Sequence, residues 1–335
     1  MLLHPAVLAL NLIAVLVAGA LCVAGAFASR ILRYWDLRSS SPRQLELERQ
    51  TYLIATLAGW ALAASVLALL LFVYTAEDLS SQLTGAMCAT GVLNANPYGW
   101  PVLGLKVVVV FGAAAWLALD GVDNASPEYP LVRQKYLLLL GLAPLTLLEA
   151  ILQLRFFAAL DPEVITSCCG SLFAADAEGV AATISAAPAG WGMLALAITA
   201  PLVMLAGHRF RTSGAGGGWF ALTASIAFAA ALVSIVSAVA LFAYEHPHHH
   251  CPFCILKAGH GYVGYWLYVP LFIATATALS AGLISRWVNL PGLSEVIRKR
   301  GRWLASLSLG GFVIFYAVSV VVIARSNLVL GDLWW

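Results

Sequence analysis

The sequence predicts an all-α integral membrane protein with about eight transmembrane helices, arranged as two parallel four-helix repeats. Composition is the first observation: 61% of the 335 residues are hydrophobic and only 10% are charged, whereas a soluble domain carries about 25% charged residues. The second observation is that the apolar residues gather in runs of the length that crosses a bilayer, about 20 residues. A chain with so few charges cannot cover its apolar side chains in water.

Eight apolar runs are long enough to span the membrane. Continuous runs of this length indicate helices, because a membrane β-barrel would instead show short segments of alternating hydrophobicity. The fifth run is the shortest of the eight. The predicted spans are residues 5–28, 52–75, 101–120, 136–159, 191–207, 219–243, 265–284 and 303–324.

The basic residues give the expected orientation, because cytoplasmic connections of membrane proteins are enriched in Lys and Arg. Fourteen of the 18 basic residues lie in alternate connections, those between spans one and two, three and four, five and six, and seven and eight. We therefore expect these connections in the cytoplasm and both termini outside, in a bacterial inner membrane. Positive charge follows the first span rather than preceding it, so we expect this span to be retained and not cleaved as a signal peptide.

The two halves of the chain resemble each other. Aligning Trp100 with Trp266 places Cys88 opposite Cys254, and residues 132–135 then fall close to residues 297–300. Equal numbers of spans with equal orientation indicate parallel repeats, although chance similarity between apolar helices would give the same pattern. The predicted organisation is a first repeat (1–160) with an outer Cys88 loop, an outer loop (161–190) with Cys168-Cys169, and a second repeat (191–335) with a His/Cys loop (245–260).

The loop at 245–260 concentrates the residues with the most distinctive chemistry. It contains the run His246-Pro247-His248-His249-His250-Cys251-Pro252-Phe253-Cys254, with His260 six residues further on. Thiolate and imidazole are ligands that zinc and copper prefer, and the histidines exceed what a dithiol alone needs. We therefore predict a Cu or Zn site, with a haem ligated by His as an alternative; covalent haem attachment lacks its Cys-x-x-Cys-His motif. The predicted ligands are Cys88, His249, His250, Cys251, Cys254 and His260.

Thiol redox chemistry is the main alternative for the same loop. Cys251-Pro252-Phe253-Cys254 resembles the Cys-Pro-x-Cys of glutaredoxins in these four residues. A Cys-x-x-Cys at the outer edge of a helical bundle also resembles, in architecture, the quinone-coupled thiol oxidoreductases of the vitamin K epoxide reductase and DsbB type. That resemblance implies a quinone cofactor and catalytic Cys251 and Cys254, with Cys88, Cys168 and Cys169 passing electrons to a soluble partner. A third interpretation is that disulfides merely staple the outer loops.

Lys106 and Glu149 are ionisable residues within predicted spans. Glu149 falls near the middle of the fourth span, where charge is costly and indicates function by default. Cofactor binding by Glu149 and Lys106 is the functional interpretation. The alternatives are that a polar neighbour on another helix satisfies Glu149, and that Lys106 extends to the outer lipid headgroups.

The residues Tyr244-Glu245, His249-His250-Cys251-Pro252-Phe253-Cys254 and Ser167-Cys168-Cys169-Gly170 are similar to those of a family of bacterial multi-pass membrane proteins. The resemblance implies no particular activity.

From the residues themselves we expect extracytoplasmic handling of a soft metal, with a periplasmic metal or thiol protein as partner. The alternatives are a quinone-coupled thiol oxidoreductase and a scaffold subunit of a larger membrane complex. No nucleotide-binding motif and no basic stripe occur, so neither nucleotide nor nucleic acid is expected as a ligand.

Overall fold

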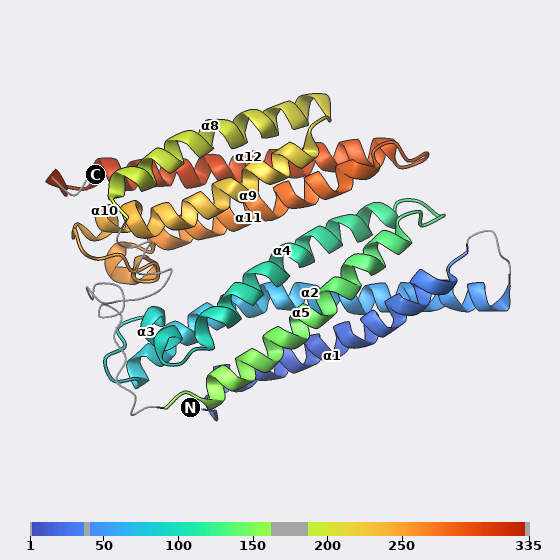
Figure 1. Ribbon diagram of the computed structural model, residues 1–335, viewed down its shortest axis with the longest axis horizontal. Helices are drawn as coiled ribbons and strands as arrows, with labels where there is room; N and C mark the ends of the chain where they lie inside the picture. Colours follow the sequence, from blue (N-terminus) through green and yellow to red (C-terminus); the bar gives the residue numbers. More distant parts are fainter. Residues whose placement is uncertain (1, 37–40, 162–186, 332–335) are drawn as a thin grey trace. The chain divides into compact units, whose positions relative to one another are not determined.

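The computed structural model describes residues 2–36, 41–161 and 187–331, whose regular secondary structure is entirely helical (Figure 1). Within these ranges, eight helices are long and apolar enough to cross a membrane, so the predicted fold class is confirmed. Most of the outer loop 161–190, including Cys168 and Cys169, lies outside the described residues. The spans are α1 (Pro5–Tyr34), α2 (Pro42–Leu79), α4 (Gly99–Asp123), α5 (Val132–Ala158), α8 (Ala189–Ser213), α9 (Gly217–Ser234) continued by a π-helical turn (Ile235–Val239) and α10 (Ala240–Tyr244), α11 (Val263–Ile284) and α12 (Ser294–Arg325).

Several helices extend beyond the apolar runs that predict them. Helix α2 begins ten residues before its apolar run, because Ser41 caps it: the Ser41 hydroxyl accepts a hydrogen bond from the Gln44 N–H at 3.3 Å, and Pro42 occupies the first turn. Helix α12 likewise begins at Ser294, and its first turns carry a cluster of basic residues. These polar extensions cannot be identified from hydropathy alone, since they lie outside the apolar window.

The first of two compact units consists of the described residues of Met1–Thr84, Val92–Ile165 and Leu290–Val296, and contains α1, α2, α4 and α5. Its core holds large buried side chains such as Trp116, Tyr136 and Phe27, whose close van der Waals packing stabilises a helical bundle in lipid. The Phe27 and Tyr136 rings pack edge to face with centroids 5.9 Å apart. Helix α5 packs mainly against α1 and α4, and α2 also packs against α1.

The second unit consists of the described residues of Gly85–Gly91, Thr166–Asn289 and Ile297–Trp335, and contains α8 to α12. Small residues let α9 and α11 approach closely: a Cβ added at Gly282 would lie 2.6 Å from the Ala221 Cβ and 2.8 Å from the Gly217 carbonyl oxygen. Residues 85–91, which carry Cys88, are part of this unit although the chain on either side belongs to the first. Each unit holds four of the eight spans, as the predicted duplication requires; the duplication itself stays a prediction.

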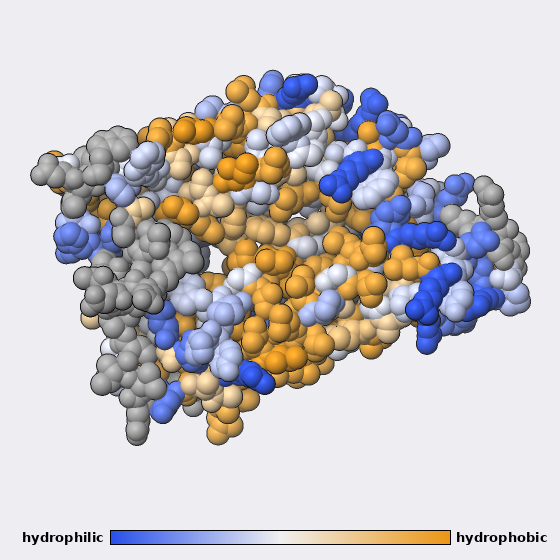
Figure 2. Space-filling model, viewed as in Figure 1, coloured by the Kyte–Doolittle hydropathy of each residue, from blue (hydrophilic) through white to orange (hydrophobic). Residues whose placement is uncertain are grey.

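The surface of each unit fits a lipid environment along its helices. Figure 2 shows hydrophobic residues covering the middle of the helices, with hydrophilic residues gathered toward helix ends and connections. Large apolar side chains point outward along the spans, among them Leu12 and Leu16 of α1, and Trp219 and Ile226 of α9. Exposed apolar surface of this extent is unfavourable in water but matches a bilayer. The chain therefore has the features of a multi-pass membrane protein.

Candidate metal site at the cysteine cluster

Three cysteine side chains meet within the second unit. The Sγ atoms of Cys88 and Cys251 lie 3.3 Å apart, and with Cys254 all three sulfur atoms lie within 4.8 Å of one another. Cys88 directly precedes the short helix α3 (Ala89–Asn94), whereas Cys251 and Cys254 lie in the connection between α10 and α11. All three thiols are buried. Sequence positions separated by 163 residues thus contribute to one cluster.

Two tyrosines fix the backbone of the Cys-Pro-Phe-Cys segment. Tyr244, the last residue of α10, donates from its hydroxyl to the carbonyl oxygen of Cys251 at 2.5 Å. Tyr268, one turn into α11, donates to the carbonyl oxygen of Pro252 at 2.8 Å. Both bonds are partly buried, so they satisfy carbonyl groups that would otherwise be costly to desolvate. The helix ends on both sides of the loop therefore hold the position of its sulfur atoms.

Hydrogen bonds connect the segment that carries Cys88 to the same loop. Lys257 donates from Nζ to the carbonyl oxygen of Met87 at 2.5 Å. The hydroxyl of Thr90 lies 3.2 Å from the Sγ of Cys251, close enough for a hydrogen bond to sulfur. Contacts on both sides of Cys88 therefore keep its thiol beside Cys251, and the position of this thiol does not depend on a bond between the two sulfur atoms.

The thiols of Cys251 and Cys254 differ in pKa. Hydrogen bonds from the thiols of Cys254 and Cys88 lower the pKa of Cys251, because they stabilise its thiolate. The pKa of Cys254 is raised, first by its hydrogen bond to Cys251 and then by that to Cys88, since removing its proton would place negative charges side by side. Cys251 is therefore the thiol that ionises first. A thiolate, rather than a thiol, is the form that binds metal and attacks disulfides.

His250 is directed to a helix backbone. Its Nδ1 lies 3.0 Å from the carbonyl oxygen of Val236, and because a carbonyl can only accept, Nδ1 is the donor. Val236 lies in the π-helical turn Ile235–Val239, a type of helix irregularity often found at functional sites. Burial, together with the neighbouring His248 and His249, lowers the pKa of His250, so the ring is neutral near pH 7.

His249 and His260 pack against one tyrosine. Their ring centroids lie 4.1 Å and 4.6 Å from that of Tyr244, on the loop side of α10. Burial, and then His249 and Lys257, lower the pKa of His260. Among the described residues, the group of side chains that could hold a metal ion contains Cys88, Cys251 and Cys254 but none of the three histidines. Metal binding by His249, His250 and His260 therefore stays a prediction.

Lys106 and Glu149 form a buried ion pair in the first unit. Lys106 Nζ lies 2.6 Å from Glu149 Oε1, and both side chains are almost fully buried. The ammonium also lies 5.4 Å from the centroid of the Phe72 ring, within the range of a cation–π contact. Lys106 therefore points into the bundle instead of extending to the headgroups, because an opposite charge is available on α5. Cofactor binding by this pair stays a prediction.

The sequence analysis assigned no role in the site to three residues that shape the cluster. The only feature of the sequence that connects Thr90 with the site is its position two residues after Cys88. Tyr244 and Tyr268 flank the loop, but a tyrosine at the end of an apolar run is commonly an interfacial residue. Their contacts with Cys251 and Pro252 require the three-dimensional path of the loop, which residue spacing does not give.

The fold and the site together define a multi-pass helical membrane protein with a buried three-cysteine cluster that could hold a metal ion. Comparisons with known proteins add no closer assignment: no family model, no curated protein and no solved structure matches the chain.

Proposed function

We propose that the protein binds a soft metal ion, Cu(I) in preference to Zn(II), through Cys88, Cys251 and Cys254. The observation that carries this proposal is the approach of three buried sulfur atoms, from two distant segments, to within 4.8 Å. A disulfide that only stapled the loops would need two of them. Three sulfur donors without an imidazole among them suit Cu(I), whereas structural zinc takes four ligands.

The three sulfur atoms would have to move only slightly to bind a metal ion. Metal–sulfur bonds of about 2.3 Å in a trigonal arrangement place the sulfur atoms about 4 Å apart. The Cys88–Cys251 separation of 3.3 Å would open slightly, and the limit of 4.8 Å for the cluster already includes the required spacing. Cys251 supplies the first thiolate because its pKa is lowered by the two neighbouring thiols. Binding of the positive ion would then favour loss of the remaining protons.

The biological role that we infer is extracytoplasmic metal handling in a bacterial inner membrane. In the second unit the cysteine loop connects α10 to α11, whereas Arg286 follows the opposite end of α11 and Arg209 lies near the end of α8. Basic connections face the cytoplasm, so the cysteine end would face outward. A periplasmic protein with its own sulfur or imidazole ligands would deliver the ion or receive it.

Metal loading of the full-length protein tests the proposal. Protein purified in a neutral detergent under reducing conditions is incubated with Cu(I), separated from free ion and measured by elemental analysis. We expect about one copper ion per chain, and loss of nearly all of it in a Cys251→Ser, Cys254→Ser variant. Cys22→Ser is the matched control, because Cys22 is exposed on α1. Absence of copper from the unaltered protein, or equal copper in the double variant, would refute the proposal.

Thiol–disulfide exchange is the second candidate function, and the 3.3 Å separation of the Cys88 and Cys251 sulfur atoms favours it. Oxidation would join these two sulfur atoms, releasing two protons and two electrons to a membrane quinone. After losing its proton, Cys254 would then attack the Cys251 sulfur, forming a Cys251–Cys254 disulfide and releasing Cys88 as a thiolate that takes up a proton. Thiol trapping in intact membranes separates the candidates: a disulfide whose fraction follows quinone supply, in protein without bound copper, supports exchange rather than metal binding.

A further inference from the structure

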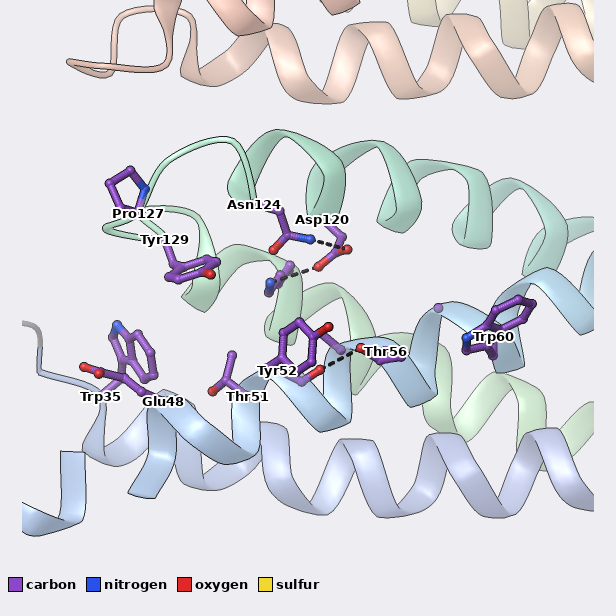
Figure 3. Close-up of a pocket in the computed structure, with 13 residues that line it drawn as sticks. Trp35, Glu48, Thr51, Tyr52, Thr56, Trp60, Asp120, Asn124, Pro127 and Tyr129 are labelled. Carbon is purple, nitrogen blue, oxygen red and sulfur yellow. Dashed lines mark hydrogen bonds and ion pairs between the residues drawn. The ribbon is translucent and has the colours of Figure 1, made fainter. Parts of the chain in front are cut away.

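A cavity of about 420 Å³ lies in the first unit (Figure 3). None of the three clustered cysteines lines it, and all three belong to the second unit. It is bounded by the first half of α2 and by the end of α4 with the connection that follows it. Aromatic side chains form much of its wall: Trp35, Tyr52, Trp60 and Tyr129. Its volume is in the range of sites that bind small molecules, about 300–1,000 Å³.

The charged groups of the cavity leave an excess of negative charge. Lys135 Nζ lies 2.9 Å from a carboxylate oxygen of Asp120 and 2.9 Å from one of Asp123, so two carboxylates share one ammonium group. Of these two carboxylates only Asp120 lines the cavity, and Glu48 is the second lining carboxylate. The Arg133 guanidinium, which is not part of the lining, donates to the carbonyl oxygen of Trp35 at 2.8 Å. The charged lining residues Glu48, Asp120 and Lys135 therefore carry a net charge of −1, which favours a cation over an anion.

Three polar side chains of the wall donate their hydrogen bonds to the chain itself. The hydroxyls of Thr51 and Thr56 donate to carbonyl oxygens one helical turn earlier, at 2.7 Å and 2.9 Å. The side-chain amide of Asn124 donates to Asp120 at 2.9 Å. The side-chain oxygen atoms of these residues can therefore accept hydrogen bonds from a ligand. Glu48 itself accepts a hydrogen bond from Gln44 at 2.9 Å and retains acceptor capacity on its second oxygen.

We propose that this cavity binds an organic ammonium group carried on an apolar body. The ammonium group would donate to Glu48, the Asp120 carboxylate would add to the negative charge of the cavity, and the body would pack against the rings of Trp35 and Tyr129, which come from the two facing sides in Figure 3. Aromatic faces add cation–π attraction to the carboxylates. Tyr52 and Trp60 are largely exposed on α2, a position typical of the membrane–water interface. The ligand is therefore either a soluble amine or the ammonium headgroup of a lipid.

Binding of 2-phenylethylammonium to the full chain tests the site. Calorimetry in dodecyl maltoside, a neutral detergent, should show saturable binding. Two compounds of matched size, neutral 2-phenylethanol and anionic 3-phenylpropanoate, should bind at least about tenfold more weakly because neither carries a positive charge. Equal binding of the anion would overturn the proposal.

A pair of variants on one helix assigns the binding to the cavity. Glu48→Gln should weaken 2-phenylethylammonium binding about tenfold, since a carboxylate facing the ammonium group is lost. Glu46→Gln is the matched control: it removes the same charge two residues away, where Glu46 accepts from Gln50 at 2.5 Å outside the cavity. Both positions are exposed, so neither change disturbs the core. Unchanged affinity in Glu48→Gln would refute the site.

The source of the ammonium group is resolved by adding lipid to the detergent. Phosphatidylethanolamine that raises the apparent Kd for 2-phenylethylammonium, where phosphatidylglycerol does not, supports the site with a lipid headgroup as the ligand. An equal, small effect of both lipids supports the site with a soluble amine as the ligand. A Cys251→Ser, Cys254→Ser variant should bind the amine normally, which separates this result from that of the metal proposal.

Discussion

The sulfur atoms of Cys88 and Cys251 lie 3.3 Å apart although 163 residues separate them in the chain. Both cysteines belong to the second unit, and both are buried. A contact of this kind between distant segments can be tested chemically without knowledge of the function, because only neighbouring thiols join under a mild oxidant.

Oxidation should link Cys88 to Cys251. In a variant that lacks Cys22, Cys168, Cys169 and Cys254, brief treatment with diamide should close a covalent loop between cysteines 163 positions apart and increase mobility on a non-reducing gel. Cys88→Ser in the same background should abolish the change. Complete labelling of both thiols by N-ethylmaleimide after diamide treatment, with unchanged mobility, would contradict the observed contact.

Metal binding should survive loss of the three histidines. We expect a His249→Ala, His250→Ala, His260→Ala variant to retain its copper, because His250 donates to Val236 and the other two rings pack against Tyr244. X-ray absorption of the loaded protein should show sulfur neighbours at about 2.3 Å and no imidazole scattering. Loss of copper in the triple variant, with the Cys251→Ser, Cys254→Ser variant as the positive control for loss, would return histidine to the ligand set.

Breaking the Lys106–Glu149 pair should destabilise the first unit. Glu149→Gln leaves a buried ammonium group without its counter-charge, which costs about 3–5 kcal/mol when such a pair is broken. Thermal unfolding in detergent should show this as a lower Tm, and Lys106→Met combined with Glu149→Gln should restore much of the loss. Glu128→Gln, in the exposed connection after α4, is the control expected to leave Tm unchanged. Equal Tm values for Glu149→Gln and the control would mean that the pair adds nothing to stability.

A methyl group at Gly264 should displace the turn that follows the cysteine loop. A Cβ there would lie 2.8 Å from the Leu256 side chain and 3.1 Å from the Ile255 carbonyl carbon, in the turn that begins at Cys254. Leu256 can rotate away but the backbone must shift, so we expect Gly264→Ala to lower stability by about 1–3 kcal/mol and to reduce copper binding. Gly259→Ala, where no atom lies within 4 Å, is the matched control. Normal copper loading and Tm in Gly264→Ala would show that the loop tolerates the displacement.

The spans were predictable because each depends on local composition. Every apolar run of about 20 residues became a helix, whereas the capped polar start of α2 at Ser41 needed hydrogen-bond geometry to locate it. Cys88 was grouped with Cys251 and Cys254 because the predicted duplication would place their loops in equivalent positions on the outer face, and the three sulfur atoms do lie together. The histidine contacts were not, because the choice between a metal, a carbonyl and a tyrosine ring for His250 or His249 depends on the path of the loop.

The pairing of Lys106 with Glu149 also bears on how the protein is made. Helix α4 emerges from the ribosome before α5, so the lysine reaches the translocon 43 residues ahead of its carboxylate partner. Lysine at the centre of a helix costs about 2.5–3.5 kcal/mol in translocon-mediated insertion, and the cost is smaller but still unfavourable for Lys106, the eighth of the 25 residues of α4. We therefore expect α4 and α5 to enter the bilayer together as a hairpin. A nascent chain truncated before Glu149 should insert α4 less completely than one carrying Lys106→Leu, a difference that glycosylation mapping would measure.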